Sequence, residues 1–108
     1  MTTADTALAL GSGDVNVLGT PRALALAEAA TVAAAASSLT DGQTTVGTRV
    51  ELDHIAPTPV GATVRAEATL VDHHRRRLTF EVRLVQDGEV VARGRITRAI
   101  VDRHRFPG

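Results

Sequence analysis

A glutamate lies alone in an apolar stretch, and a histidine closes a stretch of alternating polarity further along the chain. Glu28 is the only charged residue in ALALAEAATVAAAA, residues 23–36. Burying an unpaired carboxylate would cost on the order of several kcal/mol. Alternation places His54 on the apolar side of its segment, facing the helix that carries Glu28, so the two could form an acid/base pair. Alternatively, Glu28 pairs with an arginine and His54 satisfies a core hydrogen bond. The alternation predicts that four side chains share the inner side with His54: Val46, Thr48, Val50 and Leu52.

Thr20 stands at the start of the same apolar stretch, directly before Pro21. This order predicts a helix that begins with Thr20 as N-cap and Pro21 at its first position. The hydroxyl would then lie about two turns before Glu28, where it could also contact a ligand at the helix N-terminus. Cap and ligand contact are compatible roles.

Two more residues are unusual for the inner side of a sheet. Gly47 interrupts a strand-like segment, which indicates either close approach of a ligand or backbone, or a bulge. Arg98 shares an alternating face with apolar residues, so its guanidinium needs a counter-charge from Glu28, a ligand or another subunit. The apolar residues of that face are Val90, Ala92, Ile96 and Ile100.

The periodicity along the chain predicts one helix followed by strands. The helix is expected to run from Thr20 to about Ser37, and its apolar character on nearly every side predicts that other structure encloses it. Strands are expected at 44–55, 62–72, 77–87 and 89–101, with a further short one at 5–10. We therefore expect an α+β domain in which a curved antiparallel sheet of about five strands wraps one long buried helix.

Composition narrows the possible partners and compartments. The chain has 108 residues, no cysteine and a net charge of zero, which predicts a single domain over 1–108, no nucleic-acid or membrane binding, and no thiolate metal site. The N-terminus lacks the basic start of a signal peptide, so we expect a soluble, cytoplasmic protein. HHRRR at 73–77 and RHR at 103–105 are interpreted as solvated segments rather than metal or phosphate sites.

Five segments together resemble a known family. They are VLGTP at 17–21, the glutamate of ALAEAA, VGTRVELDHIAPTPVGATV at 46–64, RRLTFEV at 76–82 and GRITRAIVD at 94–102. The chain resembles the hot-dog-fold thioesterases, in the branch typified by fluoroacetyl-CoA thioesterase, over roughly residues 15 to 106. The His-x-Ala-x-Thr-Pro-x-Gly pattern at 54–61 is the most specific part.

The resemblance implies an activity and a set of roles. It places the catalytic threonine, glutamate and histidine of the family on Thr20, Glu28 and His54, and the substrate-contacting glycine and arginine on Gly47 and Arg98. It implies hydrolysis of a small acyl-CoA thioester to acid and CoA, with Glu28 as general base or nucleophile, His54 as acid and Thr20 assisting. No cofactor is expected beyond the CoA of the substrate. A homodimer joined edge to edge, with active sites near the interface, is implied as well.

The sequence departs from the family in one respect and leaves other functions open. The segment LALGSGDVN at 8–16 has no aromatic residue, whereas the fluoroacetate enzymes cover the site with phenylalanines there, so fluoroacetyl selectivity is not carried over. A binding module for acyl-CoA or another small ligand, without turnover, is one alternative. An enoyl-CoA hydratase is another, although GDVNVLG at 13–19 has Gly19 where the hydratase motif has its histidine.

Overall fold

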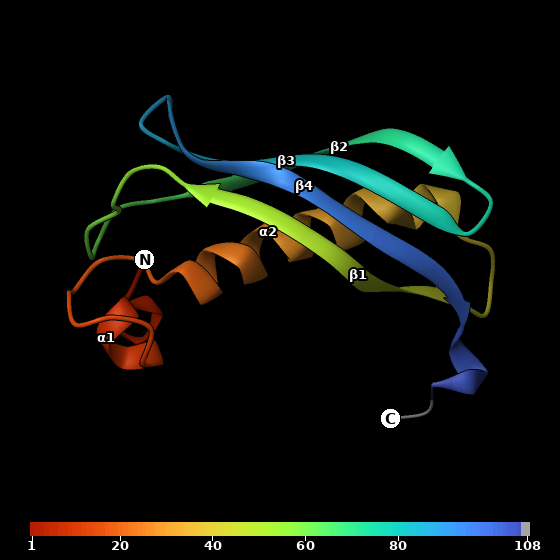
Figure 1. Cartoon of the computed structure of the whole chain (residues 1–108), viewed down its shortest axis with the longest axis horizontal. Coiled ribbons are helices and arrows are strands. Elements are labelled where there is room, and N and C mark those ends of the chain that lie inside the picture. Colours follow the sequence, from red (N-terminus) through yellow and green to blue (C-terminus); the bar gives the residue numbers. More distant parts are fainter. Residues whose placement is uncertain (107–108) are drawn as a thin grey trace.

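One long helix packs against one face of a curved four-stranded antiparallel sheet. The computed structural model describes residues 1–106. The helix α2 spans Thr20–Ala35, and the strands are β1 (Gln43–His54), β2 (Arg65–His74), β3 (Arg77–Gln86) and β4 (Glu89–Asp102). The strand order is β1-β4-β3-β2, so β1 and β2 form the two edges. Figure 1 shows α2 lying along the sheet beneath its strands.

The core lies between α2 and the two central strands. Leu78, Phe80, Val82 and Leu84 of β3 alternate inward as predicted and are all buried. The helix meets them with a stripe of small residues spaced four apart, which lets α2 lie close to the sheet: Ala23, Ala27, Thr31 and Ala35. Enclosure of the helix is one-sided, since Val32 on its opposite side is 52% exposed.

The segment before α2 is helical, so the expected strand at 5–10 is wrong. Residues Thr3–Asp5 form a 3₁₀ turn and α1 spans Ala7–Leu10. Thr6 caps α1 by accepting a hydrogen bond from the Ala9 N–H, and Gly11 ends it with a φ of 70°. An N-terminal cap, good helix formers and a left-handed C-terminal glycine together favour the helix over a strand. The sheet therefore has four strands rather than about five.

A bulge in β1 changes which of its side chains face α2. Gly47 pairs with Arg98 and Arg49 with Thr97, so Thr48 is an extra residue in the ladder. Opposed residues of an antiparallel pair share a face, and the inward side of β1 therefore carries Thr45 and Gly47 before the bulge and Val50, Leu52 and His54 after it. Val46 and Thr48 do not share the face of His54, contrary to the prediction.

A second bulge, in β4, makes one residue of the predicted inner face wrong. Leu84 pairs with Ala92 and Val85 with Val90, so Val91 is the extra residue. Ala92, Ile96 and Ile100 lie on the inner face with Arg98 and are buried, whereas Val90 lines the outer face. An unbroken alternation cannot account for this change of side.

Candidate active site

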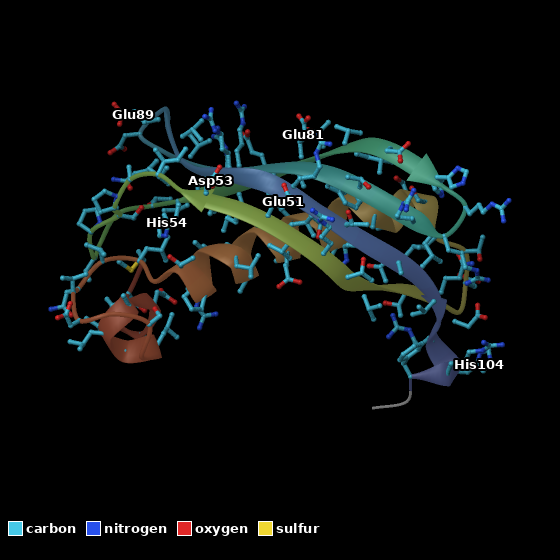
Figure 2. All side chains as sticks on the ribbon, in the orientation of Figure 1. Glu51, Asp53, His54, Glu81, Glu89 and His104 are labelled. Atoms are coloured by element: carbon cyan, nitrogen blue, oxygen red, sulfur yellow. The ribbon has the colours of Figure 1, made fainter. Side chains whose placement is uncertain are left out.

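Thr20 and His54 are brought together where α2 begins and β1 ends. The Thr20 Oγ1 and His54 Nδ1 atoms are 2.9 Å apart and share a hydrogen bond. Gly19, not Thr20, is the N-cap of α2, and Pro21 follows within the first turn. The predicted capping role of Thr20 is therefore wrong, and its hydroxyl is turned towards the imidazole instead. In Figure 2, His54 lies between the end of β1 and the start of α2.

The surroundings of His54 favour its neutral form. Partial burial lowers the pKa of the His54 imidazole below its ordinary value of 6.5, because desolvation penalises the charged ring. The Nε2 atom is buried and has no hydrogen-bond partner within residues 1–106. A neutral ring bonded to a hydroxyl on one side keeps its other nitrogen free for a ligand or a second protein group.

Glu28, Gly47 and Arg98 form a second cluster further along the helix. The Arg98 Nη1 and Glu28 Oε2 atoms are 3.6 Å apart, with side-chain exposures of 8% and 38%. A Cβ atom placed on Gly47 would come 2.9 Å from Glu28 Oε2, so the absence of a side chain at Gly47 makes room for the carboxylate. Of the two interpretations of Gly47, the bulge beside it is observed, and the group that approaches it in this chain is a side chain rather than a backbone or a ligand.

The two clusters do not touch within one chain. Thr20 and Glu28 are eight residues apart on α2, which separates them by about 12 Å along the helix axis. No hydrogen bond or ion pair joins Glu28 to His54 in the part of the chain that the structure describes. The single chain thus presents a hydroxyl–imidazole pair and a carboxylate–guanidinium pair on the same helix, one at its start and one near its middle.

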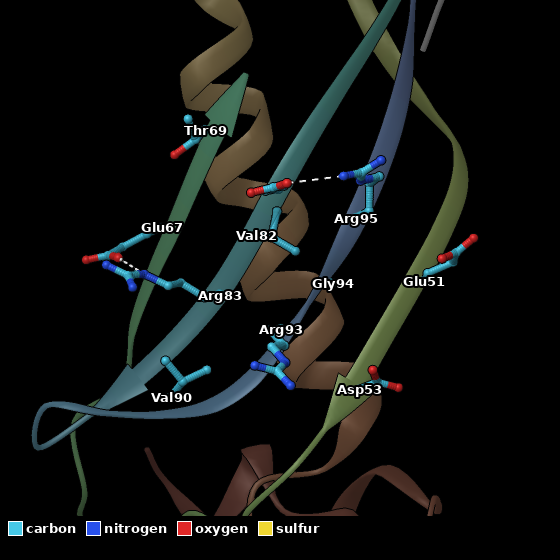
Figure 3. A pocket seen from close by; sticks show the side chains of 11 residues that line it. Glu51, Asp53, Glu67, Thr69, Val82, Arg83, Val90, Arg93, Gly94 and Arg95 are labelled. Carbon is cyan, nitrogen blue, oxygen red and sulfur yellow. Dashed lines mark hydrogen bonds and ion pairs between the residues drawn. The ribbon is translucent and has the colours of Figure 1, made fainter. Parts of the chain in front are cut away.

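Hollows lie on both sides of the sheet, but only one borders these residues. Thr20 and His54 line a groove of about 330 Å³ together with Asp14, Ile55 and Pro57. A groove of about 620 Å³ on the outer face contains none of the five predicted site residues. Two ion pairs cross its strands, Arg83 to Glu67 and Arg95 to Glu81 (Figure 3), and Arg93 lies opposite Asp53 in the β1–β4 ladder. Such paired charges are typical of a solvated sheet face.

Sequence reasoning missed Thr45, which contacts the cluster of Glu28, Gly47 and Arg98. Thr45 holds the Arg98 guanidinium through its side chain and its backbone carbonyl. The inward position of Thr45 follows from the β1 bulge, and unbroken alternation assigns it to the wrong face.

No helix within residues 1–106 is long and apolar enough to cross a membrane, and no group of three or more potential metal ligands occurs there.

The sequence as a whole matches one family. A family model described as fluoroacetyl-CoA-specific thioesterase (FlK) matches residues 1–104. The chain belongs to this family. It is accordingly an acyl-CoA thioesterase, and the resemblance found in its motifs is confirmed. A search of the curated proteins found no match.

Several solved structures share the fold of this chain. The structure of the fluoroacetyl-CoA thioesterase FlK superimposes with a TM-score of 0.89 at 28% identity, covering 98% of this chain and 83% of that one. A single-residue variant of FlK in complex with fluoroacetate and CoA gives a TM-score of 0.90 at 27% identity, covering 99% and 90%. A hot-dog-like protein from Thermanaerovibrio acidaminovorans, with a TM-score of 0.84 at 21% identity over 100% and 86%, shows the same fold. The hot-dog fold is thereby confirmed.

Proposed function

We propose that this thioesterase hydrolyses a small acyl-CoA with Glu28, His54 and Thr20 as its catalytic residues and Gly47 and Arg98 in contact with the substrate. The observation that carries the proposal is the Glu28 carboxylate, which extends into the space left by Gly47 and, within residues 1–106, has one long ion-pair contact, to Arg98 at 3.6 Å. A carboxylate in a partly desolvated position without a close ion pair can accept a proton from water or attack a carbonyl. The complex of an FlK variant with fluoroacetate and CoA supports a small acyl-CoA as the substrate class.

The chemistry divides between the two clusters. Glu28 takes a proton from the attacking water, or attacks the thioester carbonyl itself to give an anhydride that water then hydrolyses. The carbonyl oxygen gains negative charge, which the Thr20 hydroxyl stabilises. The C–S bond then breaks, and the proton given up by water passes through the His54 imidazole to the CoA thiolate as the acid is released. A positioned base contributes about 10² to 10⁴ in rate, and an oxyanion donor a similar factor.

This mechanism needs the Glu28 cluster and the Thr20–His54 pair, the two half-sites, next to each other in one active site. A homodimer can bring them together. Both Gly47 and His54 are on β1, an edge strand whose outer side is unpaired in the single chain. If β1 pairs antiparallel with its copy about a twofold axis near Glu51, His54 of the partner subunit lies opposite the bulge at Gly47 and Thr48. The pairing of β1 with its copy also covers an exposed edge of 12 residues. Each active site would then combine Glu28 of one subunit with Thr20 and His54 of the other.

The test is release of CoA by the parent protein and by a Glu28→Gln variant, which preserves side-chain shape but cannot act as a base. Free thiol is measured across acyl-CoA esters of increasing length, with acetyl-CoA and fluoroacetyl-CoA included. We expect the parent to turn over short esters and Glu28→Gln to lose about 10² to 10⁴ in kcat. Glu89→Gln, at an exposed position in the β3–β4 hairpin, is the matched control and should retain the parental rate. Turnover by Glu28→Gln at the parental rate would overturn the assignment, and saturable binding of the esters by the parent without thiol release would identify a binding module.

A further inference from the structure

The Arg98 guanidinium is buried on the inner face of the sheet, and its neighbours share it unequally. Its Nε atom donates a hydrogen bond to Thr45 Oγ1 at 2.8 Å, and its Nη2 atom donates to the Thr45 backbone carbonyl at 3.2 Å. The third nitrogen, Nη1, has no hydrogen-bond partner within residues 1–106 and lies 3.6 Å from Glu28 Oε2. One residue therefore takes up two of the three nitrogens.

An arginine beside a carboxylate otherwise tends to form two parallel N–H···O bonds. Such a fork uses two neighbouring nitrogens of one guanidinium edge. Thr45 accepts one bond from Nε and one from Nη2, and these two bonds fix the orientation of the guanidinium. In this orientation Nη1 is the nitrogen that faces Glu28, at the long distance of 3.6 Å, although the arginine is buried and the carboxylate is partly so.

The fold holds Thr45 in place for this contact. Thr45 pairs with Ile100 in the β1–β4 ladder, two residues before Gly47 and on the same inward face. Its β-branched side chain is stiff at χ1 in a strand. The hydroxyl and the carbonyl of one residue thus present two acceptors in a fixed geometry to a guanidinium that enters from the adjacent strand.

We propose that Thr45 is a positioning residue that prevents Arg98 from closing a two-point ion pair on Glu28 and so leaves the carboxylate available for the reaction. This inference rests on the proposed role of Glu28. Without the hydroxyl acceptor, the guanidinium turns and binds both carboxylate oxygens. The carboxylate is then held at two points and is less free to approach water or the thioester carbonyl.

The activity test compares Thr45→Val, Thr45→Ser and the parent. Valine keeps the shape and β-branching of threonine but removes the hydroxyl, whereas serine restores it. We expect Thr45→Val to lower kcat about tenfold with KM within about twofold of the parent, because an interaction needed only in the chemical step is lost. Thr45→Ser should recover kcat to within about threefold of the parent. Thr69→Val, at an exposed position of β2 on the opposite edge of the sheet, makes the same change away from the site and should leave kcat unchanged.

The positioning role is overturned if Thr45→Val retains the parental kcat, if it raises KM alone, or if Thr45→Ser fails to restore kcat. Thermal melting establishes that each variant is folded, and Thr45→Ala replaces Thr45→Val if the latter is not. A crystal structure of Thr45→Val provides a readout that does not depend on turnover. Two Arg98 nitrogens within hydrogen-bond distance of Glu28 would support the proposal, and an unmoved guanidinium would refute it. A parent that releases no CoA from any ester contradicts the proposed function, whereas this structural readout still decides the geometry around Thr45.

Discussion

At the scale of single residues, the sequence identified the candidate site residues but predicted only some of the contacts that they make. The sequence singled out Glu28 and His54 because each is a titratable residue predicted on an apolar face, and Thr20 because it stands at the start of the helix that carries Glu28. It assigned the Thr20 hydroxyl to capping, whereas the structure pairs it with His54 Nδ1 at 2.9 Å. Cap preferences are statistical and local, and a histidine 34 residues away cannot enter such a prediction. The Glu28–Arg98 contact was among the alternatives because both residues were predicted to face inward.

His54 should give the folded protein a measurable dependence on pH. Its pKa is lowered below the ordinary value of 6.5 by desolvation, so between the lowered value and 6.5 the unfolded chain binds more protons than the folded one. The free energy of unfolding therefore falls as the pH drops below 6.5, and this contribution is fully present above that value. Denaturant unfolding of the parent and of His54→Gln across pH 5 to 7.5 should show a steeper loss in the parent. His104→Gln, at an exposed position, should behave as the parent does. Equal slopes for the parent and His54→Gln would contradict the burial of this ring.

At the scale of elements, periodicity predicted the helix and four strands to within a few residues. The strands expected at 44–55 and 77–87 are observed at Gln43–His54 and Arg77–Gln86. The wrong assignments of inward-facing residues in β1 and β4 have one cause, since each strand contains a single extra residue that reverses the alternation. A bulge shows only in the pairing with a neighbouring strand, so a single segment gives no direct signal of it. Gly47 was the local hint, and it adjoins the bulge.

Two glycines, Gly47 on the edge strand β1 and Gly94 on the central strand β4, should respond differently to alanine. At Gly47 the added Cβ would meet the ends of two flexible side chains, Glu28 at 2.9 Å and Arg98 at 3.5 Å, so Gly47→Ala should fold with a melting temperature within about 2 °C of the parent. Its kcat should fall about tenfold or more, because the carboxylate is pushed out of position. At Gly94 the Cβ would lie 1.9 Å from the Glu51 backbone oxygen, so Gly94→Ala should melt at least about 10 °C lower or fail to fold. Full activity of folded Gly47→Ala would show that the carboxylate does not need the space beside Gly47.

At the scale of the whole molecule, the sequence predicted a helix enclosed on most sides, and the single chain encloses it on one. A chain of near-zero charge can bury two kinds of surface by self-association. They are the outer side of α2, where Val32 is 52% exposed, and the two open edges of the sheet. The candidate site is also incomplete in a single chain. Its Glu28 cluster and its Thr20–His54 pair are about 12 Å apart along one helix. Neither the edge pairing nor the origin of each half-site can be predicted from one sequence, because both depend on a second copy.

The most direct test of the account mixes two inactive chains. Glu28→Gln and His54→Gln are each expected to release little CoA, and differently tagged copies are coexpressed so that mixed dimers form. If each active site takes Glu28 from one subunit and His54 from the other, a mixed dimer has one site with both changes and one intact site. The random mixture should then recover about a quarter of the parental activity, and purified mixed dimers about half. Activity no higher than that of the two variants measured separately would contradict a site shared between subunits.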